Sequence, residues 1–173
     1  KQYSVNSSNK EKIYDYISQD INDVTARVHK YQKAFNEIEK DFLEAKMLPV
    51  YDAGFIEMKK QYLTVGVNGL TDAAEFLGME IKPSDEYQEF VNVVLETINK
   101  INAKDRTKEA MFNTEFVPGE NLSVKNHNWD KRDNYYVSPK HIMYSSYFFN
   151  PEDESLSVID KIKLHGKDYV KYL

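Results

Sequence analysis

The residue types best suited to chemistry occur in residues 113–121, which read NTEFVPGEN. A strand-like run ends there in a Pro-Gly turn, and polar residues follow at once. Ligands of open α/β folds collect at the carboxyl ends of strands, and a turn with free backbone N–H groups can bind an anion. The pattern predicts either an anion site or a solvent-exposed turn with hydrated acidic side chains, and the spacing leaves both open.

A second candidate lies in residues 66–69, which read GVNG between a predicted strand and a predicted helix. Glycine permits a close approach of the backbone to a ligand. Asn68 could bond such a ligand or could simply cap the helix, and the plain cap is the simpler interpretation.

Other kinds of site find little support. The chain has no cysteine, so it holds no disulfide, thiolate metal site or thiol nucleophile. No two of its four histidines are spaced as zinc ligands on a helix; they are His29, His127, His141 and His165. The aromatic residues between 135 and 149 could stack on bases, but packing explains them better because the neighbouring charge is mixed.

Composition narrows the class of protein. The chain has 173 residues, which suits one domain or part of one, and 41% of them are hydrophobic. A net charge of -5 gives no support to a nucleic-acid surface, and there is no apolar run of the length that spans a membrane.

A long helix over residues 1–48 is the first element that the sequence predicts. Ser8 and Glu11 form a capping-box pattern at its start, and Pro49 disfavours helix just before itself. We expect the helix to bury an apolar stripe against a larger domain, although the stripe also permits a coiled coil. The stripe comprises Ile13, Ile17, Ile21, Val24, Val28, Tyr31, Phe35, Ile38 and Phe42.

Residues 49–173 are predicted to form an α/β part, and no linker divides the chain into two domains. Strands are expected at residues 62–68 and 112–117, with a short helix at 69–77 and a longer one from Ser84 between them. The longer helix should bury an apolar face, which comprises Tyr87, Phe90, Val91, Val94, Leu95, Ile98 and Ile101. This order is typical of parallel strands joined by a helical crossover. We expect a polar loop at 119–134, short strands at 135–137 and 145–149, and a last helix that begins at Asp153 or Ser155 and ends near Gly166.

The same segments resemble the anaerobic ribonucleoside triphosphate reductases, which are glycyl-radical enzymes. The resemblance covers roughly residues 45–173. Its most specific part is FNTEFVPGENLSVKNHNWDK at 112–131, with LTVGVNGLTDAAEFLG at 63–78 and IDKIKLHG at 159–166. PVYDAGFI at 49–56 and SSYFF at 145–149 also resemble the family.

The resemblance implies a segment of a ten-stranded α/β barrel and an enzyme that reduces ribonucleoside triphosphates to deoxyribonucleoside triphosphates. In that family a glycyl radical generates a thiyl radical, and formate commonly supplies the reducing equivalents. An iron–sulfur activating enzyme that uses S-adenosylmethionine installs the radical, four cysteines hold zinc, and ATP and deoxynucleotides act as effectors. A homodimer and a cytoplasmic location are also implied.

Because the chain has no cysteine, we expect it to be an inactive internal fragment with no catalytic residue and no metal ligand of its own. The sequence starts at Lys1, and residues 167–173 read as a helix with no stop signal, which also suggests an excised segment. The resemblance assigns substrate binding to Pro118, Gly119, Glu120 and Asn121 through their main-chain amides. Asn68, Lys125 and Glu115 are further candidates for the same site.

Two other functions remain open from the sequence. The stripe of the first helix could serve a non-enzymatic interaction module. The barrel could also belong to another glycyl-radical enzyme, such as one of the formate-lyase type.

Overall fold

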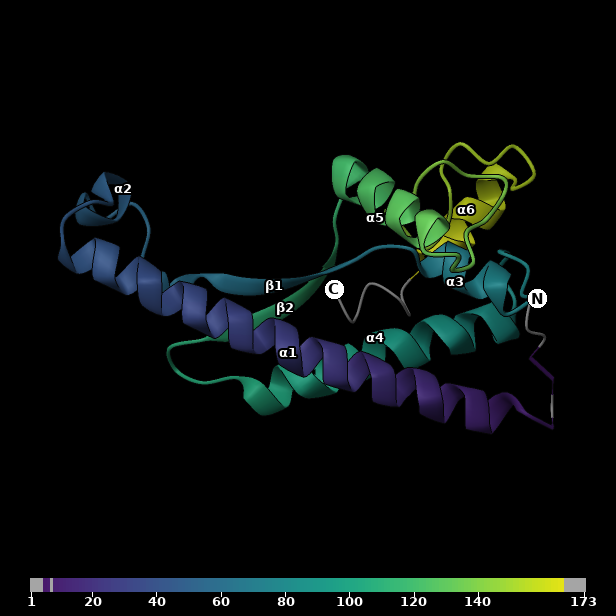
Figure 1. Ribbon diagram of the computed structural model, residues 1–173, viewed down its shortest axis with the longest axis horizontal. Coiled ribbons are helices and arrows are strands. Elements are labelled where there is room, and N and C mark those ends of the chain that lie inside the picture. The colour runs from purple at the N-terminus through teal and green to yellow at the C-terminus, as the bar shows by residue number, and fades with distance from the viewer. Residues whose placement is uncertain (1–4, 7, 167–173) are drawn as a thin grey trace.

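The computed structural model describes residues 5–6 and 8–166, except for the side chain of Glu120. The long helix α1 (Lys10–Glu44) runs along the molecule and packs against α4 (Asp85–Asp105) and strand β1 (Tyr62–Val67). The elements α3 (Leu70–Phe76), α5 (Glu120–Arg132) and α6 (Val158–His165) gather at one end (Figure 1). Two short helices, α2 (Pro49–Asp52) and η1 (Met58–Lys60), connect α1 to β1. No helix among the described residues is long and apolar enough to cross a membrane.

The start of α1 differs from the predicted capping box. The helix begins at Lys10 after Asn9, and the hydroxyl of Ser8 donates to Oδ1 of Asn6 rather than capping the helix. The backbone N–H groups of Asn9 and Lys10 donate to the Asn6 carbonyl. The preceding asparagine turn therefore takes the place of the Ser8–Glu11 pair, because a short polar side chain competes well for nearby backbone groups.

The stripe of α1 is only partly buried, which corrects the prediction that the helix buries all of it. Ile13, Ile17 and Ile21 contact the core, but Phe35 is 60% exposed and Tyr31 is 71% exposed. The face that packs on the domain is rotated by about one residue and carries polar groups. Its fully buried members are Tyr14, Thr25, His29 and Asn36.

The two strands pair in parallel, as predicted. Strand β1 lies beside β2 (Met111–Phe116), with Tyr62 opposite Met111 and Val67 opposite Phe116. Helices α3 and α4 form the crossover between them. The carboxyl ends of both strands therefore meet at the same edge. The described residues contain only these two strands, so the barrel implied by the resemblance is not formed by this part of the chain.

Helix α4 forms the centre of the core, and its predicted buried face is confirmed. Its N-cap is Ser84, whose hydroxyl accepts from the N–H of Tyr87, and Asp85 and Glu86 lie in its first turn, where the helix dipole favours acids. All seven predicted apolar residues are buried; they are Tyr87, Phe90, Val91, Val94, Leu95, Ile98 and Ile101.

The C-terminal third contains the largest errors of the sequence prediction. Residues 120–132, expected as a polar loop, form the helix α5, and residues 135–137 and 145–149 are not strands. The aromatic side chains pack in a cluster instead, in which Tyr147 stacks on Phe148 with ring centroids 4.3 Å apart. The final helix α6 begins later than predicted, with Ser157 as its cap, and ends at the predicted place.

Candidate functional site

A hydrogen bond from Asn68 joins the carboxyl ends of the two strands. Its Nδ2 donates to the carbonyl oxygen of Val117 at 3.0 Å, which joins the loop after β1 to the loop after β2. Asn68 is half-buried, and its bond to the other loop shows that its role goes beyond a local helix cap. The structure thus brings Asn68 beside residues 117–119, as the sequence analysis expected of a common site.

Gly119 lies beside Asn68 in this turn. A Cβ atom placed on it would stand 3.4 Å from Oδ1 of Asn68 and 3.8 Å from Cβ of Leu122. Its φ of -102° is open to any residue, and a Cβ alone would make ordinary van der Waals contacts, so only a side chain larger than alanine would crowd this turn. A larger side chain here would displace the Asn68 carboxamide or fill the approach to the helix start.

Helix α5 begins immediately after this turn. Gly119 is its N-cap and supplies no side-chain cap, while its carbonyl accepts the N–H of Ser123 at 2.6 Å. The first N–H groups of a helix have no partner within the helix, so those of Glu120, Asn121 and Leu122 point out of its start. Together with the helix dipole they favour a negative charge at this place.

Helix α3 begins at the end of β1, but two of the N–H groups at its start already have partners. The N–H of Gly69 donates to the carbonyl of Ser145 at 2.7 Å, and that of Thr71 donates to the Ser145 hydroxyl at 3.3 Å. Helix α5 shows no such bond to its first three N–H groups among the described residues, so its start offers more amides to a ligand than the start of α3 does.

Two further candidates from the sequence lie elsewhere. The ammonium group of Lys125 stands over the ring of Trp129, 4.6 Å from its centroid. Glu115 is exposed on β2 and accepts a bond from Asn113. Neither contact places the side chain at the turn itself.

A cavity of about 690 Å³ opens beside the turn, and most of its lining residues carry no sequence motif. Phe116 and Pro118 form one wall, Thr71 lies at the start of α3, and the segment from Lys140 to Glu152 closes the remainder. The size suits a small-molecule site. The aromatic run SSYFF at 145–149 was the only signal, and it was interpreted as a strand.

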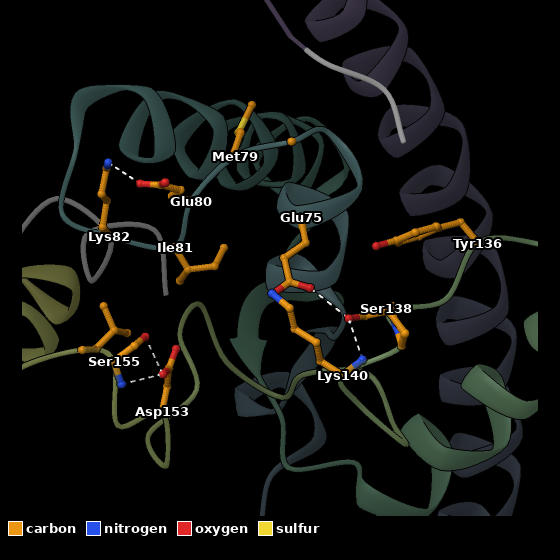
Figure 2. Close-up of a pocket in the computed structure, with 13 residues that line it drawn as sticks. Glu75, Met79, Glu80, Ile81, Lys82, Tyr136, Ser138, Lys140, Asp153 and Ser155 are labelled. Atoms are coloured by element: carbon orange, nitrogen blue, oxygen red, sulfur yellow. Dashed lines mark hydrogen bonds and ion pairs between the residues drawn. The ribbon is translucent and has the colours of Figure 1, made fainter. Parts of the chain in front are cut away.

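A second cavity, shown in Figure 2, has its charges paired internally. Lys140 lies 3.5 Å from Glu75, and the hydroxyl of Ser138 donates to the same carboxylate at 3.0 Å. Lys82 pairs with Glu80 at the other side. Both lysines that line this cavity are thus neutralised by glutamates, which makes it a poorer anion site than the start of α5.

Comparison with known proteins agrees with this fold. A family model described as anaerobic ribonucleoside-triphosphate reductase matches residues 3–172. A search of curated proteins found no match. A solved anaerobic ribonucleotide reductase has a TM-score of 0.74 at 25% sequence identity, over 83% of this chain and 23% of that chain.

Two structures of the anaerobic ribonucleotide reductase from Thermotoga maritima give the same picture. One has dATP bound in the specificity site and the other is a complex with dATP and CTP. Each has a TM-score of 0.73 at 25% identity and covers 83% of this chain and 25% of that chain. The chain thus spans about a quarter of the length of the solved structures that it matches. Since the family model matches nearly every residue, the chain belongs to the anaerobic ribonucleoside-triphosphate reductase family.

Proposed function

We propose that this chain is part of an enzyme that reduces ribonucleoside triphosphates to deoxyribonucleoside triphosphates, and that it contributes the binding site for the substrate phosphates. The observation that carries the proposal is the start of α5, where free backbone amides follow a close-packed Pro-Gly turn at the carboxyl edge of two parallel strands. Pro118, Gly119, Glu120 and Asn121 supply this turn, and Asn68 holds it against the end of β1.

The role of these residues is to bind and orient the triphosphate. Backbone N–H groups donate to phosphate oxygens, and they do so in a direction that the helix fixes before the ligand arrives. Because Asn68 joins the two strand loops, the turn is held in place when it is empty. Such preorganisation places the ribose of the nucleotide reproducibly for chemistry on other parts of the enzyme.

The radical chemistry and its cofactors are proposed to reside outside this chain. A thiyl radical needs a cysteine, and the sequence has none. Zinc does not fit here either, because no three histidine, aspartate or glutamate side chains converge on a metal-sized site within the described residues. For the complete reductase we propose a glycyl radical, zinc, formate as reductant, an activating enzyme, nucleotide effectors, a homodimer and a cytoplasmic location. The matched relatives bind dATP and CTP, which supports the nucleotide effectors.

The test is Gly119→Val in the full-length reductase that contains this sequence. We expect CTP binding to weaken at least tenfold, about 1.4 kcal/mol, because the side chain crowds Asn68 and the incoming oxygens. Binding would be measured by isothermal titration calorimetry.

The matched control is Gly54→Asn, since Gly54 has a φ of 77° that asparagine tolerates and open space around it. Normal CTP affinity of Gly119→Val would show that this turn is not the phosphate site.

A further inference from the structure

Two adjacent residues, Tyr144 and Ser145, contact both helices that begin at the strand ends. On the side of α3, Ser145 accepts the N–H groups of Gly69 and Thr71 and donates its own N–H to Oδ2 of Asp72 at 2.9 Å. These three bonds form a reciprocal cap supplied by a residue that lies more than 70 positions away along the chain. Asp72 is buried, so the cap is shielded from competing water.

On the side of α5, Tyr144 makes the corresponding contacts. Its hydroxyl donates to Oδ2 of Asp130 at 2.5 Å, and its backbone N–H approaches the carbonyl of Ser123 at 3.5 Å. Its ring lies against Gly69, where a Cβ would stand 3.6 Å from the ring, and meets the edge of His127. Burial, and next the bond to Asp130, raise the pKa of Tyr144, so its hydroxyl stays protonated and donates.

The first turn of α5 carries a buried hydroxyl that the contacts of Tyr144 do not satisfy. Ser123 is fully buried, yet its hydroxyl has no hydrogen-bond partner in the described part of the chain. A buried hydroxyl without a partner costs free energy, so the side chain of Ser123 does not itself hold the start of α5 in place.

We infer that Tyr144 and Asp130, together with Ser145, are positioning residues that fix the start of α5 relative to α3 and so set the geometry of the phosphate site. The inference rests on the proposed function. The free amides of α5 can meet a triphosphate only if the helix start stays beside the loop of Asn68. Asn68 secures the turn before α5, while the Tyr144–Asp130 bond secures the helix about three turns further on. With both bonds in place, α5 is held at two points, so its orientation relative to α3 is fixed, whereas a single bond would let it rotate.

The experiment compares Tyr144→Phe, Asp130→Ala and the double variant in the full-length reductase, with CTP as substrate. We expect each single variant to raise the KM for CTP roughly tenfold, the value of one hydrogen bond to a charged group. The double variant should be no worse than the singles, because both remove the same bond. The kcat at saturating CTP should stay within about twofold, since neither residue contacts the reacting atoms.

The control is Tyr31→Phe, which removes an exposed tyrosine hydroxyl on α1, far along the chain from this site. A lowered melting temperature with an unchanged KM for CTP would show a merely structural bond and overturn the inference. Additive effects of the two substitutions would overturn it as well. If Gly119→Val weakens CTP binding while Tyr144→Phe does not, this inference fails and the proposed function stands. If neither variant changes binding, the proposed function fails too.

Discussion

Two buried serines differ in whether their hydroxyl groups have hydrogen-bond partners. The hydroxyl of Ser138 donates to Glu75 and accepts the N–H of Lys140. The hydroxyl of Ser123 has no partner among the described residues. Both side chains are almost completely inaccessible, at 1% and 0% exposure, so burial alone does not distinguish them.

Alanine substitution should separate the two. Ser138→Ala is expected to lower the free energy of unfolding by about 1 kcal/mol, because it leaves the Glu75 carboxylate with one donor fewer. Ser123→Ala should change it by less than about 0.5 kcal/mol or raise it, because a buried unsatisfied group is removed. Urea denaturation of both variants is the measurement. A large loss for Ser123→Ala would mean that its hydroxyl bonds within the protein.

At the scale of elements, His29 joins α1 to the core. The ring nitrogens lie 2.9 Å from Oδ2 of Asp105 and 3.0 Å from Oδ1 of Asn102. Asn102 in turn donates to Thr114 on β2, and the His29 ring stacks on Phe112 at 3.8 Å. One polar side chain of α1 thus contacts both α4 and β2. This explains why the packed face of the helix is not the apolar stripe.

This junction should lose stability in acid. The hydrogen bond from His29 holds the pKa of Asp105 below its usual value. A carboxyl group whose pKa is lowered on folding stabilises the protein above its unfolded pKa of about 4, and this contribution disappears as the pH falls through the folded value. The free energy of unfolding should therefore be larger for the wild type than for Asp105→Asn at pH 7. This difference should shrink at pH 3, and urea denaturation at both pH values is the measurement. An equal difference at both pH values would contradict the assignment.

At the scale of the whole molecule, a groove of about 620 Å³ runs between α1 and the open edge of the sheet. Apolar side chains of α1, β1 and α4 line it, and further along α1 the stripe residues Phe35 and Phe42 are exposed. Apolar patches of this kind are rare on monomeric proteins.

The isolated chain should therefore self-associate. Sedimentation velocity at rising concentration is expected to show oligomers, because the groove and the stripe bury apolar surface against another copy. Phe35→Lys combined with Phe42→Lys should shift the chain toward the monomer. If the chain is a monomer at every concentration, the groove and the exposed stripe of α1 do not drive self-association.

The isolated chain should also be catalytically inactive. Under strict anaerobiosis with an activating enzyme, formate and all four ribonucleoside triphosphates, no deoxynucleotide should form, because the sequence contains no cysteine to carry a thiyl radical. Product analysis by chromatography, with a full-length anaerobic reductase as the positive control, is the measurement. Any product from the pure chain would disprove the proposed division of roles.

The sequence alone determined the features that depend on neighbouring residues. The parallel strand–helix–strand order, the apolar face of α4 and the turn before Gly119 follow from local periodicity and from Pro and Gly, which act within a few residues. The family resemblance followed from the same segments. These predictions are confirmed. In α4 and in the two strands, the secondary structure that the local sequence favours is also the one that tertiary packing stabilises.

The tertiary structure decided what depends on residues far apart in the chain. The face of α1 that packs is set by His29 and its partners on α4, and the path of residues 135–149 is set by bonds such as Tyr144–Asp130 and Ser145–Asp72. A polar sequence such as residues 120–132 forms a helix because one side of it, with Ser123 and His127, lies against the domain. Hydrophobic periodicity does not detect a buried face made of polar groups such as that of α1, where the burial of His29 is offset by Asp105 and Asn102, which only folding brings beside it.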